Sequence, residues 1–272
     1  MDRQVQPRDG TRRRVLLGLG AVGAAVLGVG GLRSSPGDRP AVGTAPSAEP
    51  AVTAPPPRSR PESTTTPYEP TTTVSEEPPP PPDPLSVVVA CRAAWGAEPA
   101  SGAMVEHVPV RLTLHHTEVS QTASNQGPQR ARRHQRYHQS LGWPDLAYHF
   151  LVDRTGLAYE GRDIRFRGDT GTDYDPTGHF LVCMEGDFDV QEPTVAQLET
   201  TVALFAWASQ RYGIDASTLK GHSSYADTSC PGSAVTAIIP DLTASVAGVG
   251  PVEIDLVCGP GGAELVSELE AG

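Results

Sequence analysis

The chain of 272 residues has few cysteines and, beyond its first segment, few basic residues. Its four cysteines, Cys91, Cys183, Cys230 and Cys258, lack the short paired spacings that would support a Cys-rich structural zinc site. Residues 1–34 hold six of the 21 basic residues but two of the 32 acidic residues, which leaves the remainder with a formal charge of about −15. A surface of that sign argues against nucleic acid as a partner.

The first segment has the pattern of an export signal. Residues 15–32 contain only Val, Leu, Gly and Ala, and Arg12, Arg13 and Arg14 precede them directly. A basic stretch before a short apolar run predicts export, and the paired arginines favour the twin-arginine route. No clear Ala-x-Ala cleavage motif follows, so a retained anchor that contacts the membrane stays open as the alternative. Either way, we expect the rest of the chain outside the cytoplasm, in the extracellular space, in the cell wall or anchored on the outer side of the membrane.

Residues 35–84 lack the apolar side chains that a core requires, and they hold 16 of the 27 prolines. We therefore expect a disordered linker there, locally stiffened as polyproline II over residues 78–82. One domain is expected over residues 85–250, which is long enough to bury its own core. Residues 251–272 are expected to form a C-terminal extension tied down by Cys258.

Apolar periodicity in the expected domain predicts strands interleaved with helices. The predicted strands are 110–116, 146–153, 158–161 and 180–185, and the predicted helices are 126–140, 195–212 and a stretch from Pro231 to about Val246. The second helix is the clearest, because Thr194 and Gln197 form a capping box and Gly213 closes its C-terminus. This order predicts an α/β (α+β) domain with a single mixed β-sheet flanked by about three helices.

Two histidines and one cysteine on separate elements are candidates for a shared metal site. His115 ends a predicted strand, His222 follows a glycine, and Cys230 precedes Pro-Gly. Each alone has an ordinary interpretation, as a polar strand end, a buried thiol or half of a disulfide. Together they supply three ligands, the number that a catalytic zinc needs if its fourth position is to stay open for water.

Five sequence blocks resemble, in order, the family of peptidoglycan recognition proteins and type 2 N-acetylmuramoyl-L-alanine amidases. The blocks are residues 92–96 (RAAWG), 114–117 (LHHT), 138 with 142–152 (GWPDLAYHFLV), 156 with 159–162 (YEGR), and 221–222 with 228–232 (TSCPG). The resemblance covers about half of the chain. It implies that family's fold, and hydrolysis of the amide bond between N-acetylmuramic acid and L-alanine in peptidoglycan.

The resemblance also implies a ligand set for Zn²⁺, namely His115, His222 and Cys230. His116 is left out, because successive side chains of a strand point to opposite faces. A zinc ion held by three ligands lowers the pKa of its bound water and polarises the amide carbonyl, which is the chemistry that the implied reaction needs.

The remaining site residues follow from the same blocks. The resemblance assigns Tyr148 and Thr228 as catalytic residues, with Tyr148 orienting the water or stabilising the oxyanion and Thr228 donating a hydrogen bond to developing negative charge. His138, Trp143 and Arg162 are the expected substrate contacts. The partner so implied is peptidoglycan, in the form of muropeptides, and we expect a monomer.

Some features depart from the family pattern or lie outside it. Residues 165–177 replace the Gly-Ala-His type of loop found in many relatives, and we expect this loop to line the groove. Cys183 reads as a buried core thiol and Glu185 as a non-catalytic carboxylate. Cys91 and Cys258 flank the domain, and an oxidising compartment favours a disulfide between them, with two free thiols as the alternative.

Two other functions stay open from the sequence. One is a module of the same fold that binds peptidoglycan without cutting it, and the other is a different zinc peptidase acting on the stem peptide. Recognition members that lack activity typically lose the cysteine ligand, whereas this chain has both Cys230 and Tyr148. We therefore favour the amidase.

Overall fold

The structure is a computed structural model that describes residues 83–121 and 126–271. The expected export signal and almost all of the expected linker fall in residues 1–82, outside the described residues. Within the described part of the chain, no helix is long and apolar enough to cross a membrane.

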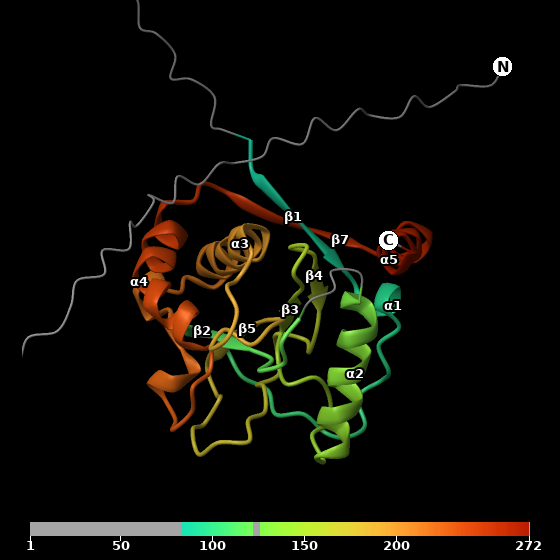
Figure 1. Cartoon of the computed structure of the whole chain (residues 1–272), viewed down its shortest axis with the longest axis horizontal. Coiled ribbons are helices and arrows are strands. Elements are labelled where there is room, and N and C mark those ends of the chain that lie inside the picture. The colour runs from blue at the N-terminus through green and yellow to red at the C-terminus, as the bar shows by residue number, and fades with distance from the viewer. Residues whose placement is uncertain (1–82, 122–125, 272) are drawn as a thin grey trace, which may run out of the picture. The chain divides into compact units, whose positions relative to one another are not determined.

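One mixed sheet forms the centre of the described domain (Figure 1). Its strands are β1 Leu85–Ala90, β2 Arg111–His116, β3 Phe150–Val152, β4 Ala158–Glu160, β5 His179–Met184, β6 Lys220–Gly221 and β7 Val252–Val257. They lie in the order β6-β2-β5-β3-β4-β1-β7, and every neighbouring pair is parallel except β3 with β4. The predicted α/β domain with a single mixed sheet is confirmed, although the strand expected over residues 146–153 is limited to β3.

The helices include the three that the sequence predicted. The α-helices are α1 Arg92–Trp95, α2 Gly127–Ser140, α3 Val195–Tyr212, α4 Ser233–Gly248 and α5 Gly259–Ala271, with short 3-10 turns η1 Ala216–Thr218 and η2 His222–Ser224. Helix α3 has the predicted bounds. Thr194 Oγ1 accepts the Gln197 N–H at 3.1 Å, Gln197 Oε1 accepts the Thr194 N–H at 3.1 Å, and Gly213 ends the helix with φ 67°.

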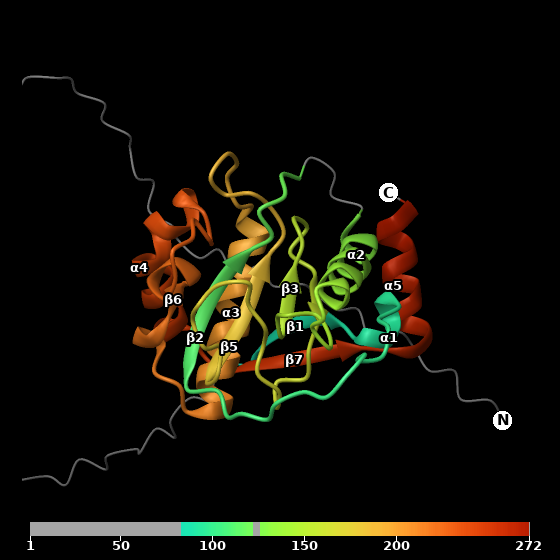
Figure 2. The ribbon, with the colours of Figure 1, turned by 90° about the horizontal axis from the view of Figure 1, so that it is seen from below.

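Helices cover both faces of the sheet, so the domain has three layers (Figure 2). Side chains alternate along each strand, and the two cores follow that alternation. On β5, Val182 and Met184 join the core under α3 and α4, whereas Cys183 joins the core under α1, α2 and α5. Alternate residues of one strand therefore pack against different sets of helices.

The C-terminal residues continue this sheet. Strand β7 pairs with β1 in parallel along six residues, from Leu85 opposite Val252 to Ala90 opposite Val257. Directly beyond the two strands, Cys91 and Cys258 form a disulfide with their Cα atoms 5.4 Å apart. The segment expected as a C-terminal extension thus supplies an edge strand and, as α5, a helix that packs on α1 and α2.

Candidate metal centre

The last two residues of strand β2 are histidines whose side chains lie on opposite faces of the sheet. His115 is buried on the α2 side, where its ring centroid lies 5.2 Å from that of Tyr148. His116 points to the other side, and its ring lies 6.0 Å from Phe188 and accepts the Phe188 N–H at 3.3 Å through Nδ1. The alternation of strand side chains thus separates the two rings, and His115 is the one that faces the other candidate ligands.

The short edge strand β6 places His222 beside His115. Leu114 pairs with Gly221, the last residue of β6, so the residue that follows each of them, His115 and His222, comes next to the other, and the two imidazole centroids lie 4.7 Å apart. Gly221 has a packing role here, because a Cβ at that position would lie 2.5 Å from Pro231 Cδ. The glycine therefore lets the Cys230-Pro231 turn pack directly under His222.

Cys230 completes the cluster from that turn. Its carbonyl accepts the Ser223 N–H at 2.7 Å, and its Sγ accepts the His116 N–H at 3.4 Å. The sulfur also lies 3.5 Å from His115 Nδ1. Strand β2 and the stretch from His222 to Cys230, which lie more than 100 residues apart in the sequence, thus converge on one buried point.

The donor set fits a zinc ion. One ligand atom from each of His115, His222 and Cys230 lies within 4.8 Å of the others, and all three side chains are buried. Standard Zn–S and Zn–N bonds at a tetrahedral angle place sulfur and nitrogen about 3.6 Å apart, close to the 3.5 Å between Cys230 Sγ and His115 Nδ1. Three ligands of borderline or soft character leave room for a fourth, exchangeable one.

Burial sets the protonation of these ligands before any ion binds. Desolvation, followed by the charge of His222, lowers the pKa of His115 well below its ordinary value, and desolvation lowers the pKa of His222 to about 4. Both imidazoles are therefore neutral at pH 7, as metal ligation requires. Burial also raises the pKa of Cys230 to about 12, so a cation that binds there must displace the thiol proton.

Tyr148 lies next to the cluster on the α2 side of the sheet. Burial, with the nearby thiols of Cys183 and Cys230, raises its pKa well above the ordinary value, so its hydroxyl stays protonated and can donate. Cys183 lies opposite His115 on β5 and is fully buried, and burial raises its pKa as well. A thiol of this kind is inert and serves packing.

The other residues expected from the sequence divide into two groups. Thr228 Oγ1 accepts the Cys230 N–H at 3.2 Å, so its hydroxyl lies beside the cysteine ligand. The His138 ring lies 5.7 Å from Tyr148 edge-on and 4.9 Å from Trp143, which builds an aromatic wall from α2 toward the cluster. Thr228 therefore lies beside the candidate site, His138 contacts Tyr148 and Trp143 contacts His138, whereas the donors of Arg162 are directed elsewhere.

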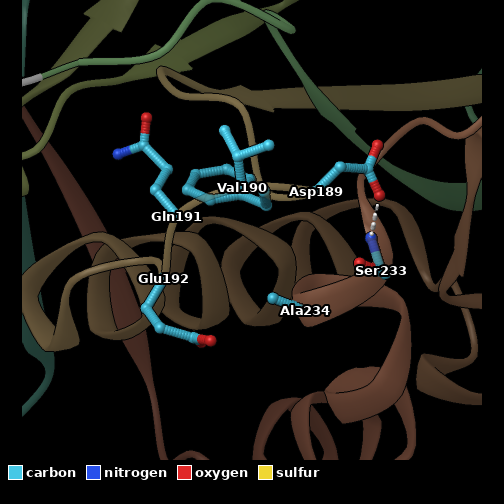
Figure 3. A pocket seen from close by; sticks show the side chains of 7 residues that line it. Asp189, Val190, Gln191, Glu192, Ser233 and Ala234 are labelled. Atoms are coloured by element: carbon cyan, nitrogen blue, oxygen red, sulfur yellow. Dashed lines mark hydrogen bonds between the residues drawn. The ribbon is translucent and has the colours of Figure 1, made fainter.

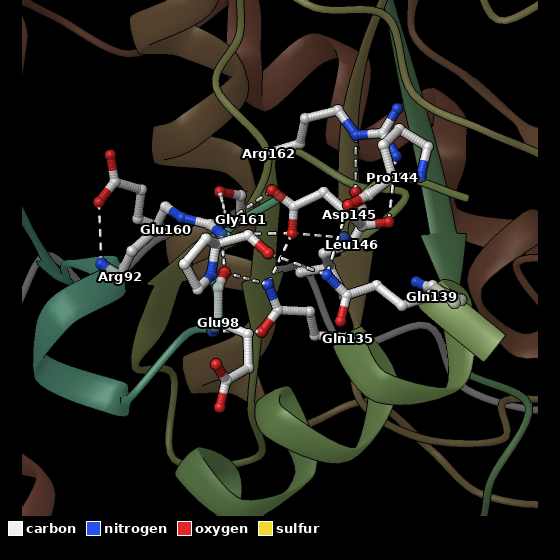
Figure 4. A network of polar contacts seen from close by, with 12 residues as sticks. Arg92, Glu98, Gln135, Gln139, Pro144, Asp145, Leu146, Glu160, Gly161 and Arg162 are labelled. Atoms are coloured by element: carbon white, nitrogen blue, oxygen red, sulfur yellow. Dashed lines mark hydrogen bonds and ion pairs between the residues drawn. The ribbon is translucent and has the colours of Figure 1, made fainter. Parts of the chain in front are cut away.

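Arg162 is placed inside the fold and not on the groove, which corrects its expected role as a substrate contact. The residue is 2% exposed, and its guanidinium donates to the carbonyls of Asp145, Leu146 and Arg167 and to the Asp169 carboxylate. Figure 4 shows Arg162 directed into the polar network around Asp145 and Leu146. With its donors committed to the protein, Arg162 ties segments together.

Glu185, which directly follows β5, is also held by contacts within the protein. Its carboxylate accepts from Gln121 Nε2 at 2.8 Å and pairs with Arg130 at 3.3 Å and with His134 at 3.0 Å. This arrangement gives the carboxylate a role in fixing α2 against the sheet.

Two site residues were not identified from the sequence, and both come from the loop 165–177. Thr172 Oγ1 lies 2.9 Å from His222 Nε2, and the Tyr174 ring lies 4.9 Å from the His222 ring. Both residues line a surface hollow of about 600 Å³ formed largely by this loop. The sequence indicated that the loop lines a groove, but nothing in it marked which side chains turn toward the ligand.

A second hollow lies elsewhere and does not belong to the candidate site. This pocket has a volume of about 490 Å³ and is lined by Phe188, Asp189, Val190, Gln191, Glu192, Ser233 and Ala234 (Figure 3). Asp189 there accepts the Ser233 N–H at 2.8 Å, at the start of α4. None of the three candidate ligands contributes to its lining.

The fold and the cluster together define a class of protein: a three-layer α/β domain whose mixed sheet carries a His-His-Cys cluster that could hold a metal ion, beside a tyrosine. Comparison with known families agrees with this class. The N-acetylmuramoyl-L-alanine amidase family matches residues 106–233. The chain is 32% identical to mouse peptidoglycan recognition protein 1 over 153 residues, which cover 54% of this chain and 84% of that protein.

Other relatives extend the comparison. Human N-acetylmuramoyl-L-alanine amidase is 32% identical over 166 residues, but the match spans 57% of this chain and 29% of the human protein. The crystal structure of Drosophila peptidoglycan recognition protein SD has a TM-score of 0.53 at 27% identity and covers 56% of this chain and 93% of its own. The chain therefore belongs to the family of N-acetylmuramoyl-L-alanine amidases and peptidoglycan recognition proteins, and the family predicted from the sequence blocks is confirmed.

Proposed function

We propose that this chain is an exported, zinc-dependent N-acetylmuramoyl-L-alanine amidase that cuts the bond between N-acetylmuramic acid and L-alanine in peptidoglycan. The observation that carries the proposal is the convergence of His115, His222 and Cys230, with the Tyr148 ring 5.2 Å from His115. A module that only binds peptidoglycan has no need of a complete three-ligand set beside a hydroxyl donor.

The residues of the chain have distinct tasks in this reaction. A zinc ion held by the cluster supplies an activated water and polarises the scissile carbonyl. Tyr148 keeps its phenolic hydrogen at neutral pH, because burial raises its pKa, and so it can donate to the oxygen on which negative charge develops. Thr228 fixes the Cys230 backbone through its oxygen and can use its own hydroxyl hydrogen for the same developing charge.

Two further observations support the proposed substrate and location. Among relatives by structure, the peptidoglycan recognition proteins LCa and LCx, with a TM-score of 0.52 at 28% identity, form an ectodomain complex bound to tracheal cytotoxin. We take this as support for a peptidoglycan fragment as the ligand of this chain. The Cys91–Cys258 disulfide supports export, because disulfides persist in oxidising compartments.

The test is the release of free stem peptide from defined muropeptides, followed by mass spectrometry. We expect release by the zinc-loaded chain and none after chelation or with Cys230→Ala, which also lowers the zinc content. Intact muropeptides that remain bound to the chain would instead indicate a recognition module, and cleavage within the stem peptide would indicate a peptidase.

Tyr148→Phe separates metal binding from catalysis. Removing one donor to a developing oxyanion lowers kcat by roughly 100 to 1,000-fold, and zinc content should not change. Tyr137→Phe is the matched control, because Tyr137 is an exposed tyrosine on α2. Loss of zinc from Tyr148→Phe would show that Tyr148 maintains the site and does not take part in the reaction.

A further inference from the structure

The loop 165–177 makes a direct hydrogen bond to one of the candidate ligands. Thr172 Oγ1 lies 2.9 Å from His222 Nε2. A second hydroxyl follows, because Thr170 Oγ1 lies 2.8 Å from Thr172 Oγ1 and also accepts the Thr172 N–H at 3.1 Å. The imidazole and the two hydroxyls form a series of hydrogen bonds that leads from His222 into the loop.

The direction of these hydrogen bonds follows from the requirement that a histidine binds a metal through a nitrogen that carries no hydrogen. Since Nε2 of His222 is engaged by Thr172, Nδ1 is the nitrogen that remains for a metal. A lone pair on Nδ1 requires the ring hydrogen on Nε2, which then donates to Thr172 Oγ1. The Thr172 hydroxyl hydrogen can in turn donate to Thr170 Oγ1, so each oxygen has a consistent role.

The N-terminal part of this loop, residues 167–169, is held against the rest of the domain. Arg162 donates to the Arg167 carbonyl at 2.7 Å and pairs with Asp169, and both contacts are at least partly buried. Gly168 packs so closely on the Ala147 carbonyl that a Cβ there would collide with it. The backbone that leads into Thr170 and Thr172 is thereby fixed, and the Tyr174 ring from the same loop lies 4.9 Å from the His222 ring.

We propose that Thr172 is a positioning residue, which fixes the tautomer and the ring orientation of His222 and so tunes the zinc affinity of the cluster. The hydrogen bond from the second ring nitrogen of a ligand histidine commonly sets both properties, and its loss costs roughly 10 to 100-fold in metal affinity or activity. Thr170 supports Thr172 by accepting from both its hydroxyl and its backbone. This inference rests on the proposed zinc site but concerns binding of the metal and not turnover.

The test compares zinc affinity among variants of the full chain, by competition with a chromophoric chelator at fixed pH. Thr172→Val keeps the β-branched shape and removes the hydroxyl, so we expect zinc to bind roughly 10 to 100-fold more weakly. Thr172→Ser restores the hydroxyl and should bind zinc like the wild type. Thr177→Val is the matched control, because Thr177 lies in the same loop and its hydroxyl bonds to Asp175 instead.

The outcomes separate this proposal from the proposed function. A wild-type chain that binds no zinc would overturn both. Zinc affinity unchanged in Thr172→Val, or lowered equally in Thr172→Val and Thr172→Ser, would overturn the role of the hydroxyl and leave the amidase proposal standing.

A measurement on the wild type covers the case in which Thr172→Val does not fold. In the zinc-loaded chain, the hydrogen on His222 Nε2 should be visible by NMR and exchange slowly with water, since it is bonded to Thr172. Exchange as fast as that of an exposed imidazole would contradict the proposal.

Discussion

His149, next to Tyr148 in the chain, should make the stability of the domain depend on pH. The ring is completely buried, Nδ1 accepts the Leu181 N–H at 2.9 Å, and Nε2 lies 3.0 Å from the Phe166 carbonyl, to which it donates. Both nitrogens are satisfied only in the neutral ring, because a second hydrogen on Nδ1 would point at the Leu181 N–H. Burial, the largest cause, lowers the pKa of His149 from 6.5 to about 3.

The sign and size of the effect follow from proton linkage. The unfolded chain takes up a proton on His149 as the pH falls through about 6.5, whereas the folded chain does not until about pH 3. Because the unfolded state binds more protons in that window, the free energy of unfolding falls as the pH is lowered. For this one residue the loss between pH 7 and pH 5 is about 2 kcal/mol.

The assay is urea unfolding at pH 7, 6 and 5, with a chelator present so that the candidate metal site stays free of metal throughout. His149→Asn places an amide oxygen near the position of Nδ1 and cannot take up a proton in this range. We expect the variant to be less stable at pH 7, but to lose about 2 kcal/mol less than the wild type on going to pH 5. The same loss in both chains would refute the assignment of this pH dependence to His149.

Three further substitutions test contacts that stabilise the domain around the candidate site. Cys258→Ser removes the disulfide to Cys91, which closes a loop of 167 residues, and should lower the free energy of unfolding in urea by about 2 to 5 kcal/mol. Added reductant should have little further effect on the stability of this variant. Gly127→Ala puts a methyl group against Asp153 and the Tyr159 hydroxyl, and should lower the melting temperature by an amount equivalent to about 1 to 3 kcal/mol. Arg162→Met leaves buried carbonyls without their donor and should cost about 3 kcal/mol in the same urea titration.

Each of these expectations has a contrary result. A Cys258→Ser chain as stable as the oxidised wild type would show that the bridge does not constrain the unfolded chain. Unchanged stability in Gly127→Ala would mean that α2 can shift away from Asp153 without cost. Full stability in Arg162→Met would show that its carbonyl partners find other donors.

The parts of the fold that were predicted are those whose signals are local. Helix α3 could be predicted to the residue, because Thr194, Gln197 and Gly213 mark its ends within a single stretch of chain. Strand β7 was missed, since it is an edge strand with several exposed residues and its partner β1 lies more than 160 residues earlier. Its pairing depends on contacts that no local pattern records.

The residues of the candidate site likewise divide into those that a sequence pattern could identify and those that it could not. The family blocks supplied His115, His222 and Cys230, and strand alternation then placed His116 on the opposite face of the sheet. No such period governs a loop, so the sequence could not show that Arg162 turns inward to hold residues 167–169, or that Thr172 turns toward His222. A motif position therefore identifies a ligand more readily than it identifies what orients the ligand. The contact between Thr172 and His222 comes from the loop 165–177, and no local sequence pattern fixes the side-chain directions of a loop.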